Sequence, residues 1–190
     1  MRKIAVLASG GGTLAEAIFQ AVDQKVLSCS VEALICDKSD ALVIERAHKY
    51  KIPVHLHPMS QDRQQWNLEL LSYLQSLNVD LVVSAGFMRI LDHSVTSSLP
   101  IINSHPALLP LFPGAHAVRD ALAAGATKTG TTIHWVDAGV DTGEIIAQAE
   151  LAIFPGENEE TLHERIKILE RSLIVATIEQ LLSTMENDRS

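Results

Sequence analysis

Lys3-Ile4-Ala5-Val6-Leu7-Ala8, followed by Ser9-Gly10-Gly11-Gly12-Thr13, is the stretch that decides the fold of this chain. The first part is a short apolar run typical of a buried strand, and the second is a glycine loop that opens a helical pattern. Strand and helix patterns then alternate, with strands at Val31–Cys36, Val54–His57, Leu81–Ala85 and Ile101–Asn103, and helices at about Leu14–Gln24, Ala41–Tyr50 and Arg63–Leu77. This alternation predicts an α/β fold, a mainly parallel sheet flanked by helices with a Rossmann-like N-terminal half.

The C-terminal part adds antiparallel character. A helix at about Ala117–Ala124 precedes a β-branched strand at Thr131–Val136, a loop at Asp137–Gly143 and a second extended segment at Glu144–Ala149. The last predicted helix runs from about Glu159 to Ser183. Its predicted apolar stripe consists of Leu162, Ile166, Leu169, Leu173 and Ala176, widened by Ile174, Ile178 and Leu181. We expect a single domain over residues 1–185 and a frayed polar tail over 186–190.

The composition and charge of the chain argue against several classes of protein. The chain has 190 residues and a formal net charge of −8, which argues against a nucleic-acid surface, since phosphate contacts need clustered Lys and Arg. Cys29 and Cys36 form no redox motif or disulfide framework. The apolar run at the N-terminus is too short for a signal peptide, and no run approaches the ~20 apolar residues of a membrane span. We therefore expect a cytoplasmic protein with small-molecule partners, no nucleic acid and no membrane.

Ligands of open parallel sheets bind beyond the carboxyl ends of the strands, where the glycine loop, Gly86 and His105 all fall. Glycines let backbone N–H groups approach an anion, and a helix N-terminus adds a favourable dipole. The loop is neither G-x-G-x-x-G nor a Walker A sequence. Two interpretations stay open here, a phosphate site and a plain tight turn capped by Thr13.

The segment Asn103-Ser104-His105-Pro106 ends an apolar strand. Because alternate side chains of a strand share a face, Asn103 and His105 project together while Ser104 points away. An amide beside an imidazole can stabilise an oxyanion and move a proton. The alternative is a strand that merely enters a proline-rich surface loop. Likewise Asp141 is either a turn former or, if it lies beside His105, a carboxylate that orients the ring.

The histidines give no metal site. The closest pair, His55 and His57, has no carboxylate or cysteine at ligand spacing nearby, so we expect no metal.

Three ordered motifs together resemble a known family, phosphoribosylglycinamide formyltransferase. They are Ala85-Gly86-Phe87-Met88-Arg89-Ile90-Leu91, Asn103-x-His105-Pro106-Ala107-Leu108-Leu109-Pro110-x-Phe112-Pro113-Gly114, and Gly130-Thr131-Thr132-Ile133-His134-Trp135-Val136-x4-Asp141-Thr142-Gly143. The resemblance runs from Lys3 to about Leu181. It implies a transferase of one-carbon metabolism that moves the formyl group of 10-formyltetrahydrofolate, a co-substrate, to the amine of glycinamide ribonucleotide in de novo purine biosynthesis. It also implies direct attack by the amine, without a protein nucleophile, in a monomer or homodimer.

The resemblance assigns roles to individual residues. It implies that Asn103 and His105 stabilise the oxyanion with help from Asp141, and that Thr132 and His134 support them. The nucleotide would contact Gly11, Gly12, Thr13, Leu14, Ala15, Gly86, Lys167 and Glu170. The folate would contact Arg63, Met88, Arg89, Ile90, Leu91, Asn103, Val136, Asp137, Ala138, Gly139, Val140 and Asp141. Leu14 departs from the family, many of whose members have Asn there, so backbone amides and the Thr13 hydroxyl would have to hold the phosphate.

Plainer interpretations accompany these roles. Arg63 could be a solvated helix residue, Met88–Leu91 a packing loop, and Lys167 with Glu170 a surface ion pair. Two rival functions also stay open. One is another formyl-folate enzyme, either methionyl-tRNA formyltransferase, disfavoured by the charge and the lack of a C-terminal domain, or formyl-folate hydrolase, disfavoured because Lys3 already begins the first strand. The other is a non-catalytic phosphometabolite-binding module.

Overall fold

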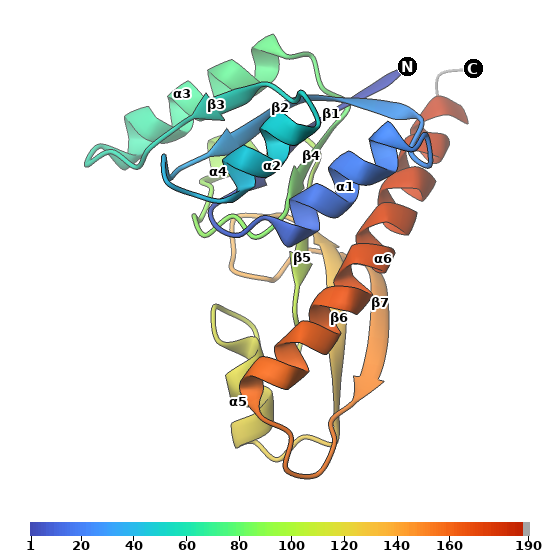
Figure 1. Ribbon diagram of the computed structural model, residues 1–190. Coiled ribbons are helices and arrows are strands. Elements are labelled where there is room, and N and C mark those ends of the chain that lie inside the picture. The colour runs from blue at the N-terminus through green and yellow to red at the C-terminus, as the bar shows by residue number, and fades with distance from the viewer. Residues whose placement is uncertain (188–190) are drawn as a thin grey trace.

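A seven-stranded sheet forms the centre of the molecule in the computed structural model, which describes residues 1–187 (Figure 1). The strands are β1 (Arg2–Ala8), β2 (Cys29–Cys36), β3 (Val54–Leu56), β4 (Leu81–Ser84), β5 (Ile101–His105), β6 (Lys128–Trp135) and β7 (Ile145–Ala152), in the spatial order β3-β2-β1-β4-β5-β6-β7. The first five run parallel, and β6 pairs antiparallel with both β5 and β7. The predicted α/β fold with a mainly parallel sheet is confirmed.

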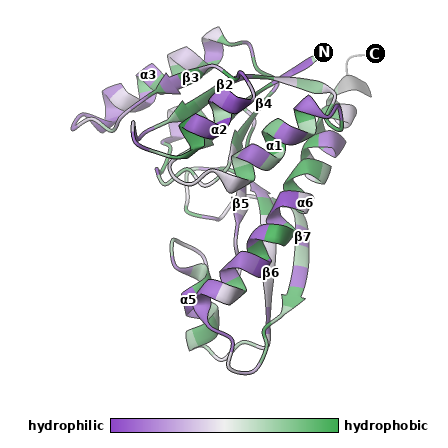
Figure 2. Cartoon of the chain, in the orientation of Figure 1, coloured by the Kyte–Doolittle hydropathy of each residue, from purple (hydrophilic) through white to green (hydrophobic). Residues whose placement is uncertain are grey.

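Helices cover both faces of this sheet. They are α1 (Thr13–Asp23), α2 (Val43–Lys49), α3 (Arg63–Ser76), α4 (His93–Thr96), α5 (Ala117–Ala123) and α6 (Glu159–Asn187). Residues of α1, α2 and α6 share one apolar core with the sheet, and residues of α3 share the other core, which also contains Val95 of α4. Figure 2 shows green, hydrophobic segments on β2 and β4 and helices along which hydrophobic and hydrophilic residues alternate.

Strand β1 lies inside the sheet, between β2 and β4, and its core side chains are apolar on both faces. Ile4 and Val6 belong to the core under α1 and α6, whereas Ala5 and Leu7 belong to the core under α3. All four are fully buried. A strand buried on both faces appears in the sequence as a continuous apolar run rather than an alternating one, which is why the opening stretch indicates a parallel sheet.

Helix α6 departs from the predicted stripe. Its buried positions are Leu162, Ile166, Glu170, Ile174, Thr177, Ile178 and Leu182, and all of them except Thr177 recur every four residues. The predicted stripe was therefore partly wrong, since Ala176 is exposed and Leu169 and Leu173 are only half-buried. The helix also continues to Asn187, which makes the first two residues of the predicted tail helical, while residues 188–190 lie outside the described part of the chain. No helix within residues 1–187 is long and apolar enough to span a membrane.

Candidate active site

Asn103 and His105 lie at the carboxyl end of β5 and line a largely apolar cavity of about 540 Å³. The Ser104 side chain points elsewhere, because its hydroxyl donates to Oε1 of Glu170 on α6 at 2.7 Å. The alternation predicted from the spacing is thus present. Two other segments also line the cavity, Phe87–Leu91 after β4 and, except for Ala138, residues 136–141 after β6.

Asp141 joins this cavity from the loop between β6 and β7. Its Oδ2 lies 3.2 Å from Nδ1 of His105, and its Oδ1 lies 3.5 Å from Nε2 of His134. The backbone N–H of Gly114 also donates to Oδ2 at 2.8 Å. The backbone of Asp141 is left-handed, with φ of 54°. A residue that tolerates this conformation better than most, such as Asp, is needed to turn the carboxylate inward.

The charge of Asp141 is stabilised where it lies. Burial opposes ionisation, but the hydrogen bond with His134, the Gly114 amide and the charge of His105 together hold the pKa of the Asp141 carboxyl below its ordinary value. The carboxylate is therefore ionised at neutral pH although its side chain is only 12% exposed.

The ring of His105 lies between two oxygen atoms. Its Nε2 is 2.8 Å from the carbonyl oxygen of Phe112, and its Nδ1 faces Asp141. A doubly protonated imidazolium satisfies both neighbours, because each nitrogen then carries a hydrogen toward an acceptor. His105 is 4% exposed.

Asn103 is oriented by His134, the residue opposite it in the β5–β6 register. Nδ1 of His134 donates to the carbonyl of Trp135 at 2.8 Å, and its Nε2 lies 3.2 Å from Nδ2 of Asn103. An amide nitrogen has two hydrogens. Asn103 therefore keeps at least one amide hydrogen for a ligand in the cavity.

Thr132, opposite His105, holds the loop that follows β5. Its Oγ1 donates to the carbonyl of Ala107 at 2.7 Å and accepts from the N–H of Leu109 at 3.0 Å. Gln148 on β7 adds hydrogen bonds of 2.9 Å to the same Oγ1 and to the Leu109 carbonyl. These contacts position the loop that carries Phe112 and Gly114. Gln148 was not expected from the sequence, where it is one polar residue of an edge strand.

Comparison with known proteins places this geometry in a family. Residues 2–178 match the family model described as formyl transferase. A phosphoribosylglycinamide formyltransferase of Mycobacterium tuberculosis is 41% identical, over 94% of this chain and 84% of that protein. The enzyme of that name from Bacillus subtilis is 39% identical, over 96% of this chain and 95% of the relative. The crystal structure of phosphoribosylglycinamide formyltransferase from Bacillus halodurans superposes with a TM-score of 0.93 at 40% identity, covering 98% of both chains.

The chain belongs to the phosphoribosylglycinamide formyltransferase family. The glycine loop, which is predicted to hold the nucleotide phosphate, lies at the carboxyl end of β1. It touches the cavity wall through Ser9, whose N–H donates to the carbonyl of Gly86 at 3.2 Å and whose Oγ accepts from the N–H of Met88 at 2.9 Å. Ser9 is 1% exposed and was not singled out from the sequence. Ala15 is fully buried and can reach a ligand only through backbone atoms, whereas Leu14 is half-buried against the core.

The two nucleotide residues predicted on α6 lie in different surroundings. Glu170 is 8% exposed and bound to Ser104, and burial raises the pKa of its carboxyl despite that hydrogen bond. Nζ of Lys167 lies 2.7 Å from Glu164, one turn earlier. The surface-pair alternative for Lys167 and Glu170 is therefore wrong, since each has another partner.

The residues predicted to bind folate are mostly brought together. Met88, Arg89, Ile90, Leu91, Val136, Asp137, Gly139 and Val140 line the cavity with Asn103 and Asp141, whereas Ala138 and Arg63 do not. Nη2 of Arg63 donates to the carbonyl of Ile90 at 2.7 Å and so supports one wall from outside. Nε of Arg89 donates to the buried carboxylate of Asp37 at 2.5 Å.

The cavity has a third wall that the sequence did not indicate. His116 before α5, and Glu159 and His163 on α6, line it. His116 lies close in sequence to Pro113-Gly114, which could have indicated its place in the cavity wall. His163 lies on a polar turn of a helix, where no sequence pattern indicates a site residue. Within the part of the chain that the structure describes, no cluster of three or more His, Cys, Asp or Glu residues has the arrangement of a metal site.

Proposed function

We propose that this chain transfers the formyl group of 10-formyltetrahydrofolate to the amine of 5'-phosphoribosylglycinamide in de novo purine biosynthesis. The observation that carries the proposal is the meeting of Asn103, His105 and Asp141 at one side of a largely apolar cavity. The printed names of the relatives support the acceptor substrate.

The walls suit the two substrates differently. The segments Met88–Leu91 and Val136–Val140 supply apolar side chains and backbone polar groups, which suit a flat heteroaromatic ring such as the folate pterin. The glycine loop next to Gly86 supplies backbone N–H groups for the nucleotide phosphate. The reacting amine then approaches from the side of Gly86, which lines the cavity.

The chemistry follows from the donors present. The neutral amine attacks the formyl carbon, a nitrogen–carbon bond forms, and the carbonyl electron pair moves to oxygen. The free N–H of Asn103 and an N–H of His105 stabilise this oxyanion, for which Nε2 of His105 exchanges the Phe112 carbonyl for the substrate oxygen. Asp141 stabilises the imidazolium. Collapse breaks the bond from the formyl carbon to N10 of the folate, and the proton lost by the amine is passed to N10 by way of Asp141 and His105.

Folate turnover with and without the nucleotide tests the proposal. We expect formyl-folate consumption to require glycinamide ribonucleotide and to yield the formylated nucleotide. Nucleotide-independent release of formate would indicate a hydrolase, and absence of turnover would indicate a binding module. His105→Ala should lower kcat at least ~10²-fold in a folded protein. The matched control His48→Ala, an exposed residue on α2, should leave kcat unchanged.

A further inference from the structure

The glycine loop is fastened from behind by α2. The carbonyl oxygen of Gly10 accepts from the N–H of Val43 at 3.1 Å, and the carbonyl oxygen of Gly11 accepts from Nε of Arg46 at 2.7 Å. Gly12 has a left-handed backbone with φ of 71° and packs against Val43. The side of the loop that faces α2 is therefore fixed by two hydrogen bonds and one close contact.

These carbonyl bonds determine where the amides point. In a trans peptide the C=O and the N–H of the same plane point in opposite directions. Holding the carbonyl of Gly10 toward α2 turns the N–H of Gly11 away from α2, and holding the carbonyl of Gly11 does the same to the N–H of Gly12. Neither N–H has an acceptor among residues 1–187.

The open side of the loop has room for an anion. A Cβ added at Gly10 or Gly11 would meet nothing within 4 Å, whereas one at Gly12 would lie 2.3 Å from Cγ2 of Val43. Successive N–H groups that converge on open space form an anion-binding concavity. Their direction depends on the two bonds to α2, and only one of these involves a side chain.

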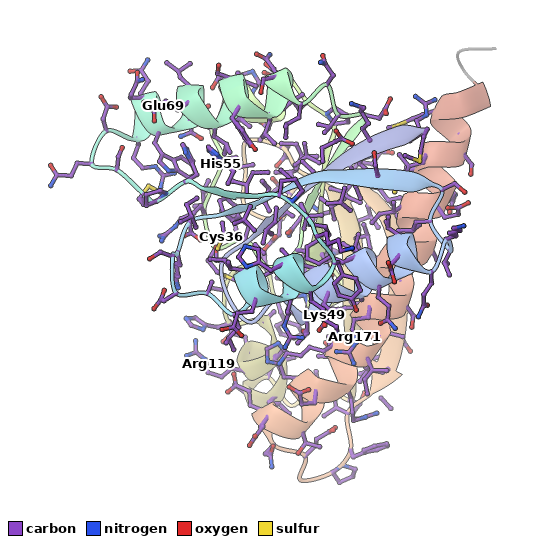
Figure 3. All side chains as sticks on the ribbon, turned by 45° about the horizontal axis from the view of Figure 1, so that its top comes forward. Cys36, Lys49, His55, Glu69, Arg119 and Arg171 are labelled. Atoms are coloured by element: carbon purple, nitrogen blue, oxygen red, sulfur yellow. The ribbon has the colours of Figure 1, made fainter. Side chains whose placement is uncertain are left out.

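That side chain, Arg46, differs from its charged neighbour. Both Arg46 and Lys49 form ion pairs with Glu16 on α1, but only Arg46 also reaches the loop carbonyl. Lys49 lies three residues further along α2 (Figure 3) and is 65% exposed, compared with 31% for Arg46. The two residues thus share a charge and a partner and differ in the contact with Gly11.

We propose that Arg46 is a positioning residue for phosphate recognition, which orients the Gly12 amide by holding the carbonyl of Gly11. The inference rests on the proposed function, in which this loop receives the phosphate of glycinamide ribonucleotide. Arg46 does not touch the substrate and contributes through the loop.

Arg46→Lys is the sharpest test, because it keeps the positive charge near Glu16 but puts a methylene where Nε–H donates to Gly11. The measured quantities are KM for the nucleotide, KM for its phosphate-free nucleoside, KM for the folate, and kcat. We expect the nucleotide KM to rise about tenfold, as for a lost charge-assisted hydrogen bond. The nucleoside KM, the folate KM and kcat should change less than about twofold, and Arg46→Met should behave like Arg46→Lys.

Lys49→Met is the matched control and should leave the nucleotide KM within about twofold. A wild-type nucleotide KM for Arg46→Lys overturns the proposal, as does an equal rise for nucleotide and nucleoside. Equal effects of Arg46→Met and Lys49→Met that disappear in high salt would also overturn it, because they would show general charge attraction. If the unaltered protein binds nucleotide and nucleoside equally well, the phosphate subsite of the proposed function fails instead.

Discussion

The carboxyl ends of β1 and β5 illustrate two ways of building a site on one sheet. At the end of β5, three side chains meet through buried charged and polar atoms, and Asp141 alone contacts His105, His134 and the Gly114 amide. At the end of β1, the glycine loop offers backbone amides, and the helix that follows has no side-chain cap. We therefore expect activity at the β5 site to depend on the functional groups of its side chains. Binding at the β1 loop should instead be lost when any side chain is added.

Removing the charge at the β5 site should have the largest effect. Asp141→Asn keeps the size of the side chain but loses the carboxylate that faces His105, so kcat should fall about 10²–10³-fold with little change in the nucleotide KM. The exposed neighbour Glu144 provides the control, since Glu144→Gln should retain kcat. A folded Asp141→Asn enzyme with near-normal kcat would show that the cluster is structural.

The Asp141 carboxylate should also make the free energy of unfolding depend on pH. Because the folded-state pKa of Asp141 is lowered, its stabilisation is present above 3.8, the ordinary value, and is lost as the pH falls through the lowered pKa. In urea titrations below about pH 4, the free energy of unfolding should decline more steeply for the wild-type protein than for Asp141→Asn.

A side chain on the open side of the β1 loop should affect binding alone. A Cβ at Gly11 meets no atom within 4 Å, so the fold should tolerate Gly11→Val, but the valine side chain blocks an anion from the amides. We expect the nucleotide KM to rise about 10- to 100-fold, with the folate KM retained. Calorimetry that shows both affinities reduced equally would point to general misfolding.

The neighbouring glycine should show the opposite pattern. Gly12→Ala forces a Cβ into Val43 at a left-handed φ of 71°, which should cost about 1–3 kcal/mol in the free energy of unfolding. Urea titrations of Gly12→Ala, of Gly11→Ala and of Gly12→Ala combined with Val43→Ala test this. The second should be within about 0.5 kcal/mol of wild type, and the third should recover part of the loss. A Gly12→Ala protein as stable as wild type would contradict the close packing on α2.

The smallest effect is expected at Glu170, the charged group under the β5 site. Burial raises the pKa of this carboxyl, so its ionisation in the folded state opposes stability as the pH rises above 4.5, the ordinary value. Glu170→Gln removes that penalty and can still accept from Ser104. Its Tm at pH 7 should exceed that of the wild type by about 2–4 °C, the shift that 1 kcal/mol gives in a chain of this size. The difference should vanish near pH 4, and a lower Tm at pH 7 would show that the ionised carboxylate is well solvated.

The parallel part of the fold could be predicted because each strand is a separate apolar run and each helix has its own periodicity. Helix α4 could not, because its four residues are too few to show a period. The stripe of α6 was misplaced because Glu170 occupies a core position, and a pattern of hydropathy skips a carboxylate whose partner, Ser104, comes from a distant strand.

The candidate site could likewise be predicted only in part from the sequence. The shared face of Asn103 and His105 follows from strand geometry, whereas the approach of Asp141 depended on a family resemblance, because a loop of aspartates and glycines suits an ordinary turn equally well. The contributions of Ser9, Gln148 and Arg46 escaped notice because each acts through a backbone atom of another segment. Such contacts leave no pattern in the sequence.

The position of β1 in the sheet bears on how the chain is synthesised. This strand lies between β2 and β4, and Leu7 pairs with Ser84, a residue made 77 positions later. At about 5–20 residues per second, the ribosome needs roughly 4–15 s to supply that neighbour. During this interval one edge of β1, with its apolar run Ile4–Ala8, stays unpaired, so the nascent chain is most open to aggregation before β4 emerges.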